Sequence, residues 1–194
     1  KYGGSGLGLS AAAAILEEVN KSGCNAGACH AQMYIMGTLL RHGSETQKTT
    51  YLPAIASGTL RLQAFGGSEP TSGTDTGSIK TNARREGDYY ILNGQKTWTS
   101  RAEHSDLMLL LVRTTPKEEC ERRTDGMSLF YTDLDRDYCD VKTIPKMGRA
   151  SGDSCEVFID GLPVPSQDRV GEEGQGFACL LHSLNPERIL IAAE

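Results

Sequence analysis

Two segments of the chain carry residue types that can bind a planar or anionic ligand. The first, Phe65–Asp75, follows a strand-like run and combines glycines and a proline with many hydroxyl groups. Backbone N–H groups and hydroxyls in such a loop can hold an anion or the polar edge of a heterocycle. Polar surface loops have the same composition, so this segment alone leaves a structural interpretation open.

The second segment is Lys96–Ser100, which contains Trp98, the single tryptophan of the chain. A flat aromatic ring with hydroxyl donors beside it suits a planar cofactor, because the ring can stack while the donors bind the cofactor's edge. A tryptophan packed in a β-sheet core is the alternative interpretation.

Other patterns with chemical potential are weaker. Gly6–Ala11 fits the G-x-G-x-x-G/A dinucleotide pattern, but no strand pattern precedes it and a helical one follows, which favours a flexible entry into a helix. The six cysteines form no C-x-x-C pair, and no set of four zinc donors can be assembled. We therefore predict no metal site, and unpaired thiols as is usual in a reducing compartment.

The elements that must position these segments begin with helices. An apolar i, i+3, i+4, i+7 face predicts a helix from near Ser10, and the nearly all-apolar run Ala28–Leu40 predicts a second, largely buried helix. Ser44 and Gln47 have the spacing of a capping box, so a third helix is predicted to start there and to end at Gly58.

From Leu60 the pattern changes to that of strands. Asn93-Gly94 separates two strand-like runs and is typical of a type I′ turn, which predicts a β-hairpin over Tyr89–Ser100. Further strand-length runs are Asp106–Val112, Met127–Thr132, Val141–Ile144 and Glu156–Ile159.

A final helix is predicted after the glycine-rich stretch that ends at Gly176, with an apolar face of Phe177, Leu180, Leu181 and Leu184. The order of helices, sheet and helix predicts an α+β fold. Its parts are a helical N-terminal domain (1–59), an antiparallel β-barrel or sandwich middle domain (60–170), and the start of a C-terminal helical domain (171–194).

The composition excludes some function classes. With 194 residues, a net charge of −5 and 38% hydrophobic residues, the chain has the profile of a globular protein with a core. Without a basic stripe, nucleic acid is not an expected partner. No apolar run approaches the roughly 20 residues that a membrane span needs. The chain starts without Met and stops inside a helical pattern, so we expect it to be truncated at both ends.

Phe65–Asp75 resembles the F/Y-x-x-T-E-P-x-x-G-S-D signature of the acyl-CoA dehydrogenase family, and Ile79–Trp98 continues that family's middle domain. Tyr2–Gly8 resembles the family's helical N-terminal half, and Gly171–Ala193 resembles the start of its third domain. The resemblance covers essentially the whole chain, with its parts in the right order.

This resemblance implies an enzyme that binds FAD between its β domain and its helical domains. Such an enzyme oxidises the Cα–Cβ bond of an acyl-CoA thioester to a trans-2-enoyl-CoA and passes the electrons to an electron-transfer flavoprotein. It also implies a soluble homotetramer or homodimer, located in the mitochondrial matrix of a eukaryote or in the cytoplasm of a bacterium.

Site residues follow from the same resemblance. The expected FAD-binding residues are Phe65, Gly67, Ser68, Gly73, Thr74, Trp98, Thr99 and Ser100. On the substrate side the resemblance implies Thr74, Asn185 and Arg188. Ser68, Thr74 and Ser100 stand where the family usually has Thr, Ser and Thr, so each position keeps its hydroxyl. Gly67 replaces a larger apolar residue, which is expected to loosen the loop.

Glu187 matches the position of the catalytic base in the isovaleryl-CoA and long-chain members. In most of the family the base is a Glu of the third domain, which would lie beyond Glu194. A general base must reach the proton that it removes, so geometry decides between these two. An ordinary helix carboxylate near Arg188 is the structural alternative for Glu187.

Other functions stay open within the same fold. An acyl-CoA oxidase or a flavin-dependent monooxygenase would show the same loop and tryptophan, since these classes differ in how the reduced flavin meets oxygen. A non-catalytic acyl-CoA-binding or flavin-binding module and a β scaffold without any cofactor are the remaining alternatives.

Overall fold

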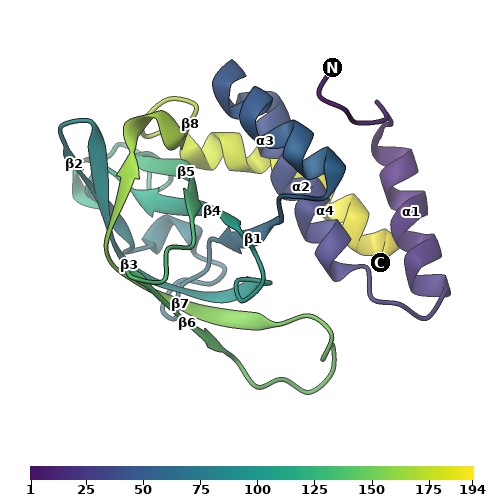
Figure 1. Cartoon of the computed structure of the whole chain (residues 1–194). Coiled ribbons are helices and arrows are strands. Elements are labelled where there is room, and N and C mark those ends of the chain that lie inside the picture. Colours follow the sequence, from purple (N-terminus) through teal and green to yellow (C-terminus); the bar gives the residue numbers. More distant parts are fainter.

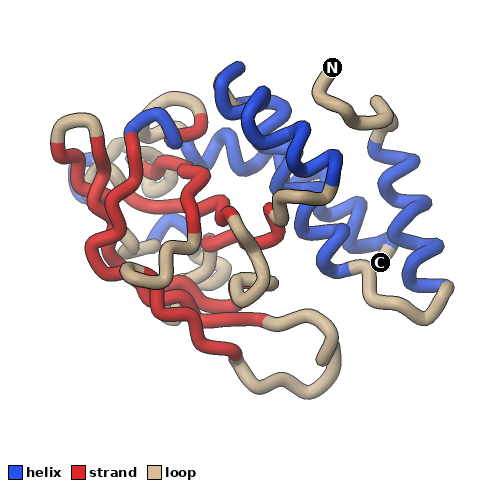
Figure 2. The backbone as a smooth tube through the Cα atoms, in the orientation of Figure 1, coloured by secondary structure: helices blue, strands red, loops and turns tan.

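A computed structural model of the chain describes all 194 residues. Three helices, α1 (Leu9–Lys21), α2 (Gly27–His42) and α3 (Glu45–Ser57), form the N-terminal part, and α4 (Gly176–Ala193) ends the chain. The helices gather on one side of the molecule and the strands on the other, and α4 runs from the sheet across to the other helices (Figures 1 and 2). This arrangement confirms the predicted α+β fold.

The ends of the N-terminal helices follow local rules. The Ser44 side chain accepts a hydrogen bond from the Gln47 backbone while the Gln47 side chain binds the Ser44 backbone, which is the predicted capping box. Gly58 ends α3 in the left-handed region, at φ 78°. Helix α1 begins at Leu9 with no strand before it, so the glycine pattern at its start is a helix entry.

One sheet contains all eight strands. They are β1 (Leu62–Gly66), β2 (Asn82–Glu86), β3 (Tyr89–Ser100), β4 (Leu107–Arg113), β5 (Met127–Asp133), β6 (Cys139–Thr143), β7 (Ser154–Pro165) and β8 (Arg169–Val170). Their order is β6-β7-β3-β2-β4-β5-β8, with β1 beside β4. Most pairs are antiparallel, while β1–β4 and β2–β4 are parallel.

The predicted hairpin turn at Asn93-Gly94 is wrong. Strand β3 continues through these two residues, and the hairpin turn lies at Gly87-Asp88, between β2 and β3. Strand β7 pairs with β3 on both sides of Asn93, and the Asn93 side chain accepts a hydrogen bond from the Gly161 backbone. A Cβ on Gly94 would lie 2.5 Å from Thr81 Oγ1. The glycine therefore permits a close strand contact at a register shift, and non-local pairing overrides the local turn preference.

Strand β4 lies at the centre of the core, with all seven of its residues buried. Leu107, Leu109 and Leu111 pack with buried residues of α2, α3 and α4, whereas Met108, Leu110 and Val112 pack with the interior of the sheet region. Alternate residues of one strand thus join two hydrophobic clusters, as the two-residue period of a strand requires.

The apolar face predicted for α4 is partly wrong. Its buried residues are Gly176, Cys179, Leu180, Ser183 and Leu190, while Leu181 is 36% exposed. The small residues are buried because α4 lies close to both β5 and α2. None of the helices is long and apolar enough to cross a membrane. All six cysteines are free thiols.

Candidate functional site at the junction of helices and sheet

A buried ion pair anchors the loop that follows β1. Lys96 Nζ lies 2.8 Å from Glu69 Oε1, and both side chains are buried. The Glu69 carboxylate also accepts the backbone N–H groups of Lys80 and Thr81, and Lys96 donates to the Gly67 carbonyl. Burial lowers the pKa of the Lys96 ammonium to about 8, although the Glu69 carboxylate favours its charged form. Glu69 is therefore a brace of the loop.

Trp98 points out of the sheet. The pairing of β3 with β7 shifts register between Lys96 and Thr99, and Trp98 adopts a left-handed backbone with φ 57°. Trp98 is 61% exposed, so it does not pack in the core of the β domain. Left-handed backbone in a bulky residue is strained and concentrates at functional sites. The bulge presents a flat aromatic surface to solvent.

The ends of β1 and β3 lie together at this point. The Ser68 carbonyl accepts a hydrogen bond of 2.9 Å from the Thr97 backbone, which fixes the loop after Phe65 beside Trp98. A Cβ on Gly67 would lie 2.7 Å from Phe65 Cζ. The Phe65 ring therefore fills the space that a side chain at position 67 would take.

The outer part of the same loop is open to solvent. Gly73 and Thr74 are exposed, as is Ser68. The turn between Ser68 and Gly73 is held by paired backbone hydrogen bonds between Glu69 and Ser72. These positions are accessible to a ligand that crosses the end of the sheet.

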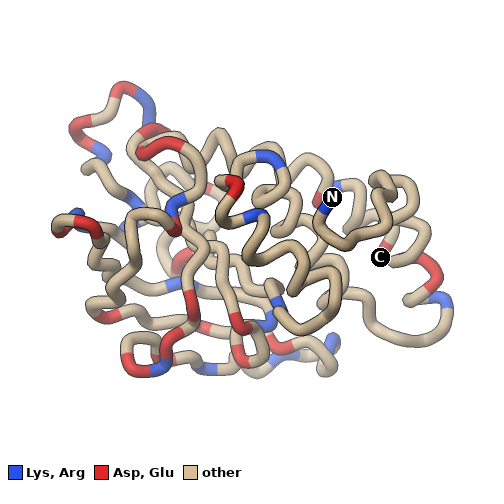
Figure 3. Tube along the Cα trace, turned by 45° about the horizontal axis from the view of Figure 1, so that its top comes forward, with Lys and Arg blue, Asp and Glu red and all other residues tan.

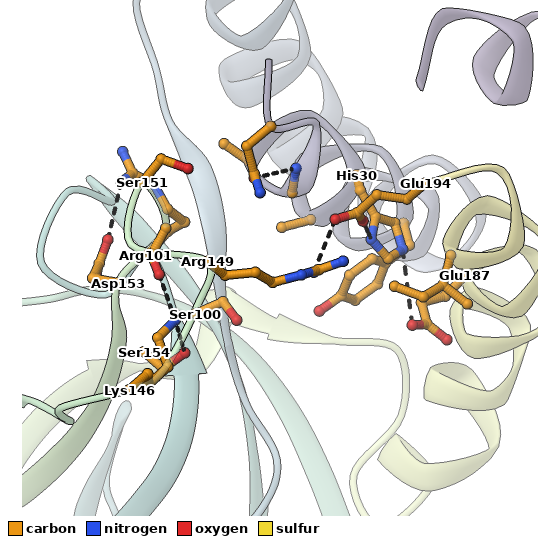
Figure 4. A pocket seen from close by; sticks show the side chains of 17 residues that line it. His30, Ser100, Arg101, Lys146, Arg149, Ser151, Asp153, Ser154, Glu187 and Glu194 are labelled. Carbon is orange, nitrogen blue, oxygen red and sulfur yellow. Dashed lines mark hydrogen bonds and ion pairs between the residues drawn. The ribbon is translucent and has the colours of Figure 1, made fainter. Parts of the chain in front are cut away.

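A cavity of about 370 Å³ separates α2 and α4 from the sheet (Figure 4). Its lining comes from α2, α4, the end of β3 and the β6–β7 loop: Asn25, Gly27, Ala28, His30, Ala31, Tyr34, Ser100, Arg101, Lys146, Arg149, Ser151, Gly152, Asp153, Ser154, Glu187, Ile191 and Glu194. Ser100 lies on the strand side and Glu187 on the helix side. The structure thus brings the predicted base and one predicted cofactor ligand to a single cavity.

Sequence reasoning missed the polar cluster on the helix side of this cavity. His30 Nδ1 lies 2.8 Å from Glu194 Oε2, and His30 Nε2 lies 3.8 Å from Glu187 Oε1. Arg149 Nη1 lies 2.9 Å from Glu194 Oε1. The available signal was a histidine inside the apolar run Ala28–Leu40, which a strictly apolar core helix would not carry.

Asn185 and Arg188 lie elsewhere on α4. Arg188 Nη1 donates to Asn185 Oδ1 at 2.8 Å, and both residues are exposed. Asn185 contributes to a separate depression with His42 and His182. Successive residues of a helix are rotated by about 100°, so Asn185 faces away from Glu187. The structure does not bring these two predicted substrate residues to the cavity.

The residues at this junction fit a flavin. A planar heterocycle needs a stacking surface, which the exposed Trp98 provides, and hydroxyl donors, which Ser68 and Ser100 provide. The Thr99 side chain is fully buried and its hydroxyl has no hydrogen-bond partner, so this hydroxyl does not face the open side of the junction. No group of three or more His, Cys, Asp and Glu side chains is placed to hold a metal ion.

Helices packed on a β domain, with an outward tryptophan and a braced polar loop at their junction, define an α+β protein with a candidate cofactor site. Comparison with known proteins identifies its family. Residues 1–59 match the acyl-CoA dehydrogenase N-terminal domain and residues 64–162 match the acyl-CoA dehydrogenase middle domain. The chain belongs to the acyl-CoA dehydrogenase family.

Individual relatives agree with this assignment. The chain is 33% identical to the mitochondrial short/branched chain specific acyl-CoA dehydrogenase of Rattus norvegicus, over 100% of this chain and 44% of the relative. A solved FAD-dependent dehydrogenase superposes with a TM-score of 0.89 at 29% identity, over 97% of this chain and 51% of that one. The prolyl acyl carrier protein oxidase AnaB superposes with a TM-score of 0.89 at 31% identity, over 99% and 51%. The chain therefore spans about half the length of the proteins that it matches.

Proposed function

We propose that the full-length protein uses FAD to oxidise the Cα–Cβ bond of an acyl-CoA thioester to the trans-2-enoyl-CoA. The observation that carries this proposal is the junction itself. Glu187 and Ser100 face one cavity from opposite sides, and Trp98, two residues before Ser100, points outward at the end of the same strand. Family membership supports the same conclusion.

Different residues of this chain have different roles in the proposed reaction. FAD, when bound, would supply the acceptor for the hydride that leaves the β-carbon. Trp98 would stack on the flavin ring, Thr99 and the hydroxyls of Ser68 and Ser100 would hold its edge, and Phe65, Gly67 and Gly73 would shape the loop around it. Glu187 accepts the α-proton at a carboxylate oxygen, and the helices on either side of it exclude water.

The proposal also includes the contacts with the substrate and the partners of the full-length protein. Thr74, exposed on the outer loop, contacts the CoA moiety, and Arg188 and Asn185 contact polar parts of the substrate outside the cavity. An electron-transfer flavoprotein accepts the electrons, and the full-length protein works as a homotetramer or homodimer. Its location is the mitochondrial matrix in a eukaryote or the cytoplasm in a bacterium.

The visible spectrum of the full-length protein tests the half-reaction. Under anaerobic conditions, we expect flavin absorption that bleaches when one member of an acyl-CoA panel is added. The acyl chain length of the thioester that bleaches the flavin identifies the substrate class. A flavin that no thioester bleaches contradicts the dehydrogenation and favours a monooxygenase-like or binding-only protein. Absence of flavin after reconstitution contradicts the cofactor site at Phe65–Asp75 and Trp98–Ser100.

Replacing the base tests Glu187 directly. Glu187→Gln removes the proton acceptor and keeps the side chain's size, so we expect bleaching to slow by about 10²- to 10⁴-fold. Glu172→Gln is the matched control, because the Glu172 side chain is 89% exposed and lies outside the cavity. Near-normal bleaching in Glu187→Gln would place the base on a residue outside this chain.

An acyl thioester oxidase is the second candidate, and the similarity to the oxidase AnaB favours it. The two functions differ in the fate of the reduced flavin. Fast reoxidation by air after anaerobic bleaching indicates the oxidase, whereas slow reoxidation by air and fast reduction of an electron-accepting dye indicate the dehydrogenase.

A further inference from the structure

We propose that His30 is a positioning residue for the carboxylate of Glu187. The proposal rests on the proposed function, in which Glu187 is the base. It assigns a role to a helix α2 residue that sequence reasoning did not connect with the site.

The geometry places one imidazole between two carboxylates. His30 Nδ1 lies 2.8 Å from Glu194 Oε2, and His30 Nε2 lies 3.8 Å from Glu187 Oε1 (Figure 4). The His30 side chain is 8% exposed, and its Nε2 atom is buried with no hydrogen-bond partner. A buried polar atom without a partner is costly, so a nearby group is expected to use it.

The two ring nitrogens face different carboxylates. Nδ1 is within hydrogen-bond distance of Glu194, which leaves Nε2 as the ring nitrogen on the side of Glu187. The contact with Glu194 fixes the orientation of the imidazole, so Nε2 is held beside the Glu187 carboxylate.

Every other charged or titratable group facing this cluster has a partner or stays neutral. Arg149, on the β6–β7 loop, pairs with Glu194. Arg101 pairs with Asp153, and Lys146 donates to Ser154 Oγ at 3.0 Å. The Tyr34 ring lies 5.4 Å from the His30 ring, and burial together with the Glu187 charge raises the Tyr34 pKa, so its phenol remains protonated. His30 is left as the side chain whose unpartnered ring nitrogen faces Glu187.

The role follows from these contacts. At 3.8 Å the contact between His30 Nε2 and Glu187 is longer than a hydrogen bond, and it becomes one if Glu187 moves slightly on substrate binding. His30 then limits the rotamers of Glu187 and holds its oxygen towards the cavity. It touches no reacting atom, and the α-proton still passes from the substrate to Glu187.

The first experiment measures the contact itself. In full-length protein with isotope-labelled histidine, NMR at one fixed pH compares the His30 ring resonances of the wild type and of Glu187→Gln. We expect the His30 resonances to shift when the Glu187 carboxylate is replaced, because the two side chains lie next to each other. Unchanged resonances overturn the proposal. The ring of His104, which is 3.8 Å from Asp153, is the internal reference and should not move.

The second experiment measures the consequence for turnover. In His30→Gln we expect kcat/KM to fall by about 10²-fold, mostly through kcat, because a small displacement of a catalytic group has that effect. His104→Gln, which removes a half-exposed histidine from an equally long carboxylate contact, should keep wild-type values.

The outcomes separate this proposal from the proposed function. A loss of kcat/KM in His30→Gln that comes through KM and not through kcat means a structural role and overturns the positioning role alone. Normal turnover in Glu187→Gln overturns the assignment of the base, and the positioning role with it. If His30→Gln does not fold, the NMR comparison of the wild type with Glu187→Gln still decides the contact.

Discussion

At the scale of single residues, the candidate site depends on buried polar contacts. Lys96 and Glu69 fix the loop that carries Gly67 and Ser68, and the strained backbone of Trp98 turns the indole outward. Each contact costs folding free energy or conformational freedom, since a buried charge must be paired and a left-handed tryptophan is rare. Such features are retained where a ligand needs a preorganised surface.

Removing one partner of the buried ion pair tests this view. Lys96→Met leaves the Glu69 carboxylate buried without a counter-ion, so we expect the free energy of unfolding to fall by about 3–5 kcal/mol. The double variant Lys96→Met with Glu69→Gln should recover part of that loss. Guanidinium chloride unfolding measures both.

The surface residue Lys21 supplies the control for that experiment. Its ammonium pairs with Glu17 and Glu18, and its side chain is 60% exposed. Lys21→Met should change the free energy of unfolding by less than about 0.5 kcal/mol. An equally small change in Lys96→Met would show that the buried pair contributes little.

At the scale of elements, the site depends on how α4 docks. The start of α4 contacts the backbone of β5, where a Cβ on Gly176 would lie 2.6 Å from the Ser128 carbonyl carbon. From this contact α4 runs beside α2, which places Glu187 opposite Ser100. A glycine at one helix end therefore determines where a carboxylate three turns away is found.

Two alanine substitutions test the docking contact. Gly176→Ala places a methyl group against strand backbone that cannot move freely, and we expect a loss of about 1–3 kcal/mol in the free energy of unfolding. Gly37, inside α2, has open space around its Cα, so Gly37→Ala should add about 0.5–1 kcal/mol through helix propensity. Thermal or denaturant unfolding reports both, and a stabilised Gly176→Ala would contradict the close docking.

At the scale of the whole molecule, the layers differ in how firmly they are held. Strand β4 is buried along its full length between the helices and the rest of the sheet. Helix α1 contributes only Leu16 as a buried residue and packs at the edge of α2 and α4 (Figure 1). Acidic and basic residues are interspersed along the loops of the strand region (Figure 3).

Hydrogen exchange should reproduce this ranking. Local opening requires less free energy where few apolar groups are buried, so the amides of α1 should exchange fastest among the helices. The amides of β4 should exchange only on global unfolding. Mass spectrometry of peptides from the two elements measures the difference, and equal protection of α1 and β4 would contradict the layered core.

Much of the fold could be predicted from the sequence because its signals are local. The capping box at Ser44 and the left-handed Gly58 set the ends of α3 through hydrogen bonds within a few residues. The apolar run of β4 and the loop motif at Phe65–Asp75 were equally recognisable. These features depend on neighbours in the chain, so they can be recognised without knowing which distant residues they contact.

What the sequence by itself determined about this protein is its family, its order of elements and the segments that carry chemistry. Only the tertiary structure decided that β3 runs through Asn93-Gly94, because β7 pairs with it from far along the chain. Only the structure placed His30 against Glu187 and Glu194, since helices distant in sequence had to pack before those side chains could meet. Local hydrogen bonds are determined by short stretches of sequence, whereas contacts between distant residues form only once the core has formed.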